Sequence, residues 1–201
     1  MRTHIVMLSG PQGSGKSTLA RALIEHHLRK KDNQAVELRF AKVIYDIHDS
    51  VLVIMRSYGI NVPTKDGELL QLLGTEWGRK KYGDDVWVKA TKKYIDACIE
   101  QNAEKNVGEL LLIVSDCRFK NEFEALPEAL RVRLIASEEV RRKRTDSWRE
   151  NTNHPSETDL DEYERKKKFD LHLYTDTTDI PTCIDLVRAQ LDKNSWAEKR
   201  R

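Results

Sequence analysis

The residues best suited to chemistry lie near the start of the chain, where residues 10–17 read GPQGSGKS. Glycines allow backbone N–H groups to close around phosphate oxygens, and a helix that starts after such a loop adds the positive end of its dipole. Lys16 can reach the β- and γ-phosphates of a nucleoside triphosphate, and the Ser17 hydroxyl can bind Mg²⁺. The spacing predicts a site for ATP or GTP with Mg²⁺, made by Gly10, Gly13, Ser14, Gly15, Lys16, Ser17 and Thr18.

The segments on either side of this loop support that interpretation. An apolar run at residues 5–8 precedes the loop, and apolar residues at 19, 23, 24 and 28 follow it with the spacing of a helix. The order strand, loop, helix is the context in which the motif binds phosphate. A glycine-rich turn that binds nothing is the alternative, and the flanking pattern disfavours it.

A second candidate site follows the apolar run at residues 110–114. Ligands of open parallel sheets sit at the carboxyl ends of the strands, so Asp116 is expected to support Mg²⁺ together with Ser17. Its alternative role is to cap a helix that starts near Phe119. Arg118 emerges at the same edge and can bind a phosphate through two hydrogen bonds, which an acceptor nucleotide needs and a hydrolysis site does not.

A basic segment, SEEVRRKRTDSWR, occupies residues 137–149. On a helix, Arg141 and Arg144 share one face, while Arg142 and Arg149 lie close to another. A solvated helix face is the ordinary explanation for so many charges. The position after the fourth expected strand favours a lid that closes over a transferring phosphoryl group and excludes water.

Strand-like apolar runs alternate with helix-like segments, which is typical of a parallel sheet covered by helices on both faces. The expected strands are residues 5–8, 36–40, 110–114, 132–135 and 171–174. The expected helices are residues 16–31, 43–58, 66–81, 85–105, 119–129, 137–150 and 180–193. The pattern predicts an α/β three-layer sandwich around a sheet of about five parallel strands.

Composition narrows the classes of partner. The 201 residues include 35 Lys and Arg against 33 Asp and Glu, a net charge of +2. This balance gives no electrostatic case for a nucleic acid polymer or an anionic membrane. The three cysteines, Cys98, Cys117 and Cys183, are far apart, which indicates neither disulfides nor a zinc site and favours a reducing cytoplasm. The first apolar run is too short for a signal peptide or a membrane span.

Four stretches together carry a resemblance to a known family. They read GPQGSGKST at 10–18, LLQLLGTEWGRKKYGDDVWVK at 69–89, IVSDCRFKNEFEA at 113–125 and RRKRTDSWRENTNHPSE at 141–157. In this order they resemble the bacteriophage-type deoxynucleoside monophosphate kinases, a branch of the P-loop nucleoside monophosphate kinases. The resemblance implies a P-loop kinase fold, Mg-ATP as donor, a deoxynucleoside monophosphate as acceptor and a deoxynucleoside diphosphate as product.

The resemblance also implies an organisation of the chain. A single domain over residues 1–201 is expected, with an acceptor-binding helical insertion at 43–90 and a basic lid at 137–163. The cytoplasm is the expected location, or the host cytoplasm if the protein is viral. The expected partners are ATP and a deoxynucleoside monophosphate, with a homodimer left open.

The family's site residues can be carried over by position. Lys16 and Ser17 would hold the donor phosphates and magnesium, Asp116 would support the metal, and Arg118 would bind the acceptor phosphate. Arg142 and Arg144 would be lid cations, followed by Arg149. The expected catalytic residues are therefore Lys16, Asp116, Arg118, Arg142 and Arg144.

Two departures bear on the acceptor. The chain has no Asp-Gly-x-Pro-Arg element of the adenylate kinase type, so adenylate is not implied. The lid also resembles that of animal-type phosphomevalonate kinases, which share a Val-Ser-Asp-x-Arg turn and a Ser-Glu after the lid. The identity of the acceptor therefore depends on residues 40–90.

Residues 40–90 offer groups that could bind a nucleobase. Tyr45 could stack on a base, Gly74 could allow a flat ligand to approach, and Thr75 or Glu76 could read its polar edge. Arg79 is either a second phosphate contact or a surface charge, and Trp77 and Trp87 are expected in the core. The expected substrate-binding residues are Tyr45, Gly74, Thr75, Glu76, Arg79, Arg118 and Arg149.

Three classes of function fit the sequence. Phosphoryl transfer to a nucleotide leads, because two groups of arginines and a helical insertion describe a cleft for two substrates. A hydrolysis-driven switch or motor is the second class, in which the lid would have no role. A regulatory module that binds a nucleotide without turnover is the third.

Overall fold

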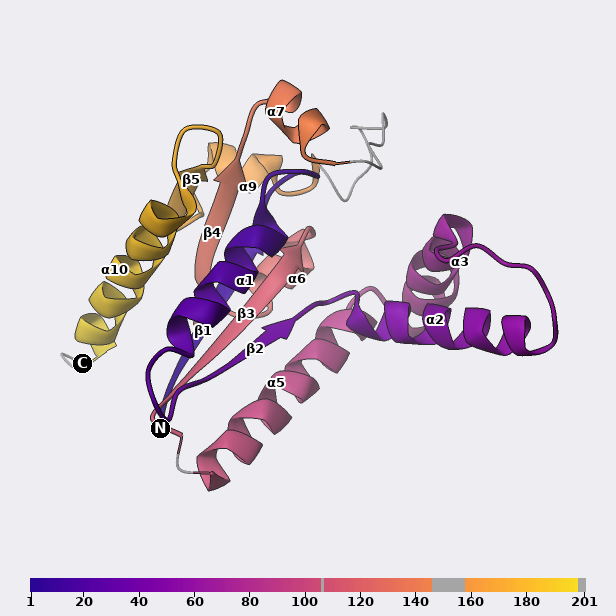
Figure 1. Ribbon diagram of the computed structural model, residues 1–201, viewed down its shortest axis with the longest axis horizontal. Helices are drawn as coiled ribbons and strands as arrows, with labels where there is room; N and C mark the ends of the chain where they lie inside the picture. The colour runs from indigo at the N-terminus through magenta and orange to yellow at the C-terminus, as the bar shows by residue number, and fades with distance from the viewer. Residues whose placement is uncertain (106, 146–157, 199–201) are drawn as a thin grey trace.

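In the computed structural model, the described residues are 1–105, 107–145 and 158–198. Five strands form one fully parallel sheet in the order β2-β3-β1-β4-β5, as the sequence predicts (Figure 1). Their bounds are β1 Arg2–Ser9, β2 Gln34–Leu38, β3 Glu109–Cys117, β4 Leu130–Ile135 and β5 Leu171–Tyr174.

Helices cover both faces of this sheet, which completes the three layers. Along β1, Val6 and Leu8 point to one face, and Ile5 and Met7 point to the other, as the period of two in a strand requires. The first face is covered by α1 (Lys16–His27) and α10 (Ile180–Glu198). The second face is covered by α5 (Val86–Glu104), α6 (Lys120–Glu124) and α9 (Asp161–Arg165).

The carboxyl ends of the central strands meet at one edge of the sheet. Ser9, the last residue of β1, pairs with Cys117 of β3 on one side and with Arg133 of β4 on the other. The loop at residues 10–15 therefore starts between the ends of β3 and β4. This register brings the first two candidate sites of the sequence to the same edge.

A helical arm, residues 42–82, extends sideways from the end of β2 (Figure 1). It consists of α2 (Lys42–Ser57), α3 (Gly67–Gln71), the π-helix η1 (Leu72–Arg79) and α4 (Lys80–Tyr82). Inside the arm, buried His48 accepts a hydrogen bond at Nε2 from the Asp66 backbone N–H at 3.0 Å, and Asp66 caps α3. Neutral His48 is thus protonated at Nδ1, which faces Asp49.

The arm is shorter than the expected insertion, because residues 86–90 belong to α5, where Trp87 and Val88 are buried. The ring of Trp87 fills the place of a side chain at Gly78, where an added Cβ would lie 2.2 Å from the ring. Trp87 is a core residue as expected. The same expectation is wrong for Trp77, which is 40% exposed and packs edge-on against Tyr82.

Several helix boundaries differ from those expected. The helix expected at 119–129 ends at Glu124, because Pro127 disfavours helical backbone at Leu126. The helix expected at 137–150 is α7 (Glu138–Lys143), and residues 146–157 lie outside the described part of the chain. Helix α9 was not expected. Among the described residues, no helix is long and apolar enough to span a membrane.

Candidate active site

The loop between β1 and α1 has a backbone that only glycine adopts without strain at key positions. Gly13 has φ of +76°, and an added Cβ would lie 2.6 Å from the carbonyl oxygen of Arg141. Gly10 has φ of +148°, and its Cβ would lie 2.5 Å from the carbonyl oxygen of Leu134. The loop is therefore packed tightly against β4 and α7, with no room for side chains.

The start of α1 is suited to bind an anion. Its N-cap, Gly15, offers no side chain to the first N–H groups, and the first turn contains no acidic residue. The Ser14 side chain is buried, and its hydroxyl has no hydrogen-bond partner in the described part of the chain. The hydroxyl-bearing residues Ser17 and Thr18 lie in the first turn, where both are exposed. The N–H groups and the helix dipole are thus available to phosphate oxygens.

Lys16 folds back over this loop. Its ammonium group donates hydrogen bonds to the carbonyl oxygens of Gly10 at 2.6 Å and Pro11 at 2.9 Å. These contacts hold a positive charge above the start of α1, where triphosphate oxygens would compete with the two carbonyls for the same donor. The residues of the loop therefore fit a nucleoside triphosphate.

Asp116 lies at the carboxyl end of β3. It binds the segment before α2 and not the start of the helix that follows Phe119. One oxygen accepts the Phe40 N–H at 2.8 Å and the other accepts the Ala41 N–H at 3.0 Å, so it fixes the turn that leads into α2. Burial raises the pKa of this carboxyl, while the two N–H groups and the charges of Arg118 and Arg39 oppose the rise. The alternative role as cap of the helix after Phe119 is wrong, because the N–H groups at the start of that helix donate to Glu122 and Asp159.

The described residues include no group of three His, Cys, Asp or Glu side chains that could hold a metal. The two expected donors, Ser17 and Asp116, fit Mg²⁺, because this ion usually keeps several waters and takes few ligands from the protein. The Ser17 hydroxyl would bind the ion beside the donor phosphates, and the remaining lone pairs of Asp116 would support its water shell.

Arg118 and Arg79 meet at one carboxylate, that of Glu122. The backbone N–H of Arg118 donates to Glu122 Oε2 at 2.8 Å, and Arg79 Nη2 donates to Oε1 at 3.3 Å. The Arg79 guanidinium also lies 4.1 Å from the centre of the Phe119 ring. Arg79 is therefore no ordinary surface charge. Glu122 was missed from the sequence, although a Glu three residues after a helix start is a known capping signal.

Arg141 of α7 and Arg144, which follows the helix, lie beside the phosphate loop. Arg141 donates to the carbonyl oxygen of Gln12 at 3.2 Å, and Arg144 donates to Thr175 Oγ1 at 3.1 Å and to the Thr175 carbonyl oxygen at 2.7 Å. Thr175 in turn donates to the carbonyl oxygen of Ser14 at 2.9 Å. Arg141 and Thr175 were not selected from the sequence, although the shared helix face of Arg141 and Arg144 was a signal for the former.

Arg142, the other expected lid cation among the described residues, makes a different contact. Arg142 is half exposed and donates to Glu138 Oε1 at 2.9 Å, one turn earlier on α7. Successive residues on a helix point about 100° apart, so Arg141 and Arg142 do not face the same side. Arg149 lies outside the described residues.

The expected base-binding residues are spread over the arm. Tyr45 is partly exposed, with Lys65 Nζ 5.5 Å from its ring centre, and Thr75 and Glu76 are exposed on η1. Gly74 is buried. Its carbonyl oxygen accepts the Trp87 indole N–H at 2.9 Å, and an added Cβ would lie 3.3 Å from Ile44. Its small size thus serves packing inside the arm.

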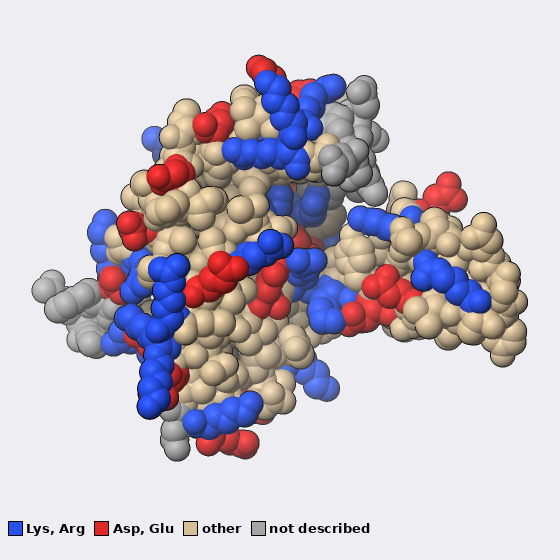
Figure 2. Space-filling view, in the orientation of Figure 1, with Lys and Arg blue, Asp and Glu red and all other residues tan. Residues whose placement is uncertain are grey.

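Figure 2 shows that the surface is hollowed between the body of the molecule and the arm, with Lys and Arg side chains around the opening. The arm forms one wall of this hollow, and α7 lies above it.

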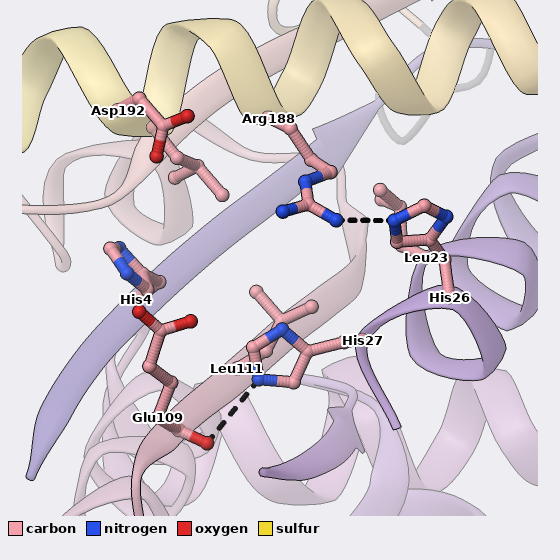
Figure 3. A pocket seen from close by; sticks show the side chains of 9 residues that line it. His4, Leu23, His26, His27, Glu109, Leu111, Arg188 and Asp192 are labelled. Carbon is pink, nitrogen blue, oxygen red and sulfur yellow. Dashed lines mark hydrogen bonds between the residues drawn. The ribbon is translucent and has the colours of Figure 1, made fainter. Parts of the chain in front are cut away.

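A separate pocket lies at the opposite edge of the sheet, far from the phosphate loop along β1 (Figure 3). His27 Nε2 donates to the carbonyl oxygen of Glu109 at 3.3 Å, and Arg188 donates to His26 Nε2. Burial lowers the pKa of His4, His26 and His27, and the Arg188 charge adds to this at His26. These histidines therefore resist protonation in the folded protein.

Known proteins resemble this chain over most of its length. A family model described as an AAA domain matches residues 6–167. No curated protein matches the chain. TT1252 from Thermus thermophilus is 17% identical over 95% of this chain and 99% of its own, with a TM-score of 0.53. Shikimate kinase from Acinetobacter baumannii in complex with shikimate is 16% identical over 96% and 94%, with a TM-score of 0.46. At this identity, the likeness to TT1252 shows the fold alone.

Proposed function

The chain belongs to the family described as an AAA domain, and we propose that it is a nucleotide kinase that transfers the γ-phosphoryl group of ATP to a deoxynucleoside monophosphate. The observation that carries the proposal is the placement of Arg79 at the end of β3. Its guanidinium pairs with Glu122, which also accepts the backbone N–H of Arg118, and the charge of the Arg118 side chain acts on the neighbouring Asp116. These two cations come from the arm and from the end of β3, outside the phosphate loop. A second anion-binding region beside a triphosphate site is what an acceptor needs.

The donor side uses the loop and α1. The backbone N–H groups and Lys16 would hold the β- and γ-phosphates, and Ser17 and Thr18 would complete the start of the helix. When bound, Mg²⁺ supplies a positive charge that neutralises the phosphate oxygens. Arg144 Nη1 lies close to Gly15, 3.9 Å from where a Cβ on that residue would be, so its charge would act on the donor as it enters.

The acceptor side uses the arm and the turn after β3. Arg118 and Arg79 would bind the monophosphate, while Tyr45, Thr75 and Glu76, which are exposed on the arm, could read a base. The attacking phosphate oxygen is anionic near neutral pH, so no general base is required. Positioning and charge neutralisation would supply the acceleration.

Two alternatives are separated by the acceptor. A phosphomevalonate-type kinase would use the same loop with a phosphorylated small acid, and an ATPase or switch would transfer the phosphoryl group to water. Of the two, only hydrolysis has no need for a cation that the arm places at the end of β3, because both kinases bind a phosphorylated acceptor. The cation that the arm contributes, Arg79, therefore favours transfer to a phosphorylated acceptor.

The experiment mixes the protein with Mg-ATP and each deoxynucleoside monophosphate in turn, with 5-phosphomevalonate, or with no acceptor, and follows the release of ADP. Release that depends on one or more of these acceptors is expected. Release without an acceptor would indicate an ATPase, release only with 5-phosphomevalonate would indicate the small-molecule kinase, and no release would indicate a binding module. Any of these three results would contradict the proposal.

A second copy of the chain is the further proposed partner. On the arm, α2 exposes Val53 and Ile54, and Tyr58 follows at its end, with exposed fractions of 60%, 58% and 82%. Large apolar side chains gathered on one element mark an interaction surface. A homodimer through α2 would bury them.

A further inference from the structure

Residues 116–122, which run from the end of β3 into the start of α6, form hydrogen bonds at both ends of the arm. Asp116 accepts the N–H groups of Phe40 and Ala41 at the start of the arm. At the other end, Asn121 Nδ2 donates to Asp85 Oδ1 at 3.0 Å, just after the arm. Glu122 accepts from Arg79 of η1. The placement of the arm therefore depends on a short turn that also carries Arg118.

Within this turn, Glu122 makes the most demanding set of contacts. It is 4% exposed, and its Oε2 accepts the N–H groups of Arg118 at 2.8 Å and Phe119 at 3.1 Å. Its Oε1 accepts from Arg79 Nη2 at 3.3 Å. A buried carboxylate is stable only when it is paired and hydrogen-bonded, so these contacts constrain one another.

The same contacts fix the plane of the Arg79 guanidinium. The Phe119 ring lies under it at 4.1 Å, and Glu122 binds one of its edges. A guanidinium has five N–H donors in a rigid fork, so an arginine held at one edge still presents donors to an anion. Side-chain entropy that is already lost in the free protein is not lost again when the anion binds.

We propose that Glu122 is a positioning residue for the acceptor phosphate, because it orients Arg79 through its side chain and Arg118 through its backbone. This inference rests on the proposed kinase function and names the group that assembles its acceptor site. The ligand class is a phosphate monoester dianion, the shared group of all deoxynucleoside monophosphates. Glu122 itself does not contact the acceptor.

The burial of Glu122 makes acceptor binding depend on pH. Burial, with the nearby charge of Asp116, raises the pKa of Glu122 to about 7, while the N–H groups of Arg118 and Phe119 and the charge of Arg79 oppose the rise. Cys117 is the other titratable neighbour, and burial raises its pKa well above the usual range. Below about pH 7, protonated Glu122 loses its charge pairing with Arg79, so the acceptor KM is expected to rise as the pH falls.

The test compares Glu122→Gln with Glu124→Gln, a substitution on the same helix at an exposed position. Gln keeps an oxygen that can accept the two N–H groups but removes the charge that holds Arg79. With thymidine monophosphate or whichever deoxynucleoside monophosphate the wild type uses best, E122Q should raise the acceptor KM about tenfold or more. The KM for ATP should change less than about twofold, and E124Q should resemble the wild type.

The pH profile gives a readout that a purely structural role would not move. A phosphate monoester also titrates, with a second pKa of about 6, so the wild-type profile alone is ambiguous. The variant resolves this, because E122Q should lose the part of the acceptor-KM increase that occurs near pH 7. Thermal unfolding of each variant shows whether it is folded, and Arg79→Lys, which keeps the charge but not the fork, replaces E122Q if the latter does not fold.

The outcomes separate the inference from the proposed function. If the wild type phosphorylates no deoxynucleoside monophosphate, the kinase proposal fails and this inference fails with it. If the wild type is active and a folded E122Q or R79K keeps the wild-type acceptor KM, the inference alone is overturned. An equal rise in the KM for ATP and for the acceptor would also overturn it, since Glu122 would then act on the whole site.

Discussion

Arg141 of α7 donates a hydrogen bond to the carbonyl oxygen of Gln12, at the tip of the phosphate loop, over 3.2 Å. Its Nε donates to the carbonyl oxygen of Ala136, so one guanidinium joins the loop to the start of α7. The helix therefore sits on the loop that would hold the donor phosphates. Arg142, the next residue, pairs with Glu138 instead.

This difference predicts unequal effects of two neighbouring substitutions. Arg141→Ala should raise the KM for ATP and lower turnover, by about tenfold or more, because the loop loses a fixed contact and the site loses a charge. Arg142→Ala should stay within about twofold of the wild type, because that side chain serves an exposed pair on one helix. Steady-state kinetics with saturating acceptor measures both. A larger effect of R142A than of R141A would show that α7 rotates when the substrates bind.

Lys16→Ala should reduce turnover by about two orders of magnitude or more, because the ammonium is the loop cation aimed at the β- and γ-phosphates. The fold should be unaffected, since the Lys16 ammonium donates to carbonyl oxygens of the same loop. Turnover and the urea midpoint of unfolding should be measured together. Retained turnover in a folded K16A would remove Lys16 from the site.

Gly78→Ala should destabilise the protein by about 2 kcal/mol or more, because the added methyl group would overlap the buried Trp87 ring and force it to shift. Gly108→Ala is the matched control, since its Cβ would lie at an ordinary distance of 3.4 Å from Asn33 Oδ1. Urea unfolding followed by tryptophan fluorescence gives both free energies. Equal values for the two variants would mean that η1 and α5 pack differently in solution.

The histidine pocket predicts loss of stability in acid. The pKa values of His4, His26 and His27 are lowered in the folded state, so the unfolded chain binds protons more readily. Their contribution is therefore complete above about pH 6.5, the unfolded value, and is lost as the pH falls below it. The histidine part of the unfolding free energy of the wild type should therefore drop as the pH falls below about 6.5. A His4→Gln, His27→Gln double variant should drop less, and an identical drop would exclude these groups as the cause.

The exposed face of α2 predicts a dimer that one charge disrupts. Ile54→Lys places an ammonium group among Val53 and Tyr58, which would be costly to bury in an apolar interface. Light scattering after size-exclusion chromatography should show a dimer for the wild type and a monomer for I54K. A wild-type monomer at micromolar concentration would contradict the proposed homodimer.

The sheet and its phosphate loop could be predicted because their signals are local. Apolar runs such as residues 110–114 are buried in the structure. The loop glycines indicate backbone with positive φ, which other residues rarely adopt. Helix ends were harder, because they depend on single residues such as Pro127 and on tertiary contacts. Helix α9 is only Asp161–Arg165, too short for a periodic pattern to reveal.

The contacts within the candidate site were less accessible to sequence reasoning. The roles of Asp116 and Glu122 depend on partners far away in the chain, Phe40 and Arg79, which no spacing rule brings together. Gly74 packs against Ile44, a contact that the sequence does not reveal, and its role at a ligand stays a prediction. The residue types in the sequence indicated which segments could form the site. The hydrogen-bond partners of each residue became clear only from the fold.

The proposed kinase passes the γ-phosphoryl group of ATP to a phosphorylated acceptor rather than to water. To test this transfer, the protein is incubated with Mg-ATP labelled on the γ-phosphate and a deoxynucleoside monophosphate, and the products are separated. The label is expected in the deoxynucleoside diphosphate, in an amount equal to the ADP formed. Label found only as inorganic phosphate, at the same rate with and without the acceptor, would contradict it.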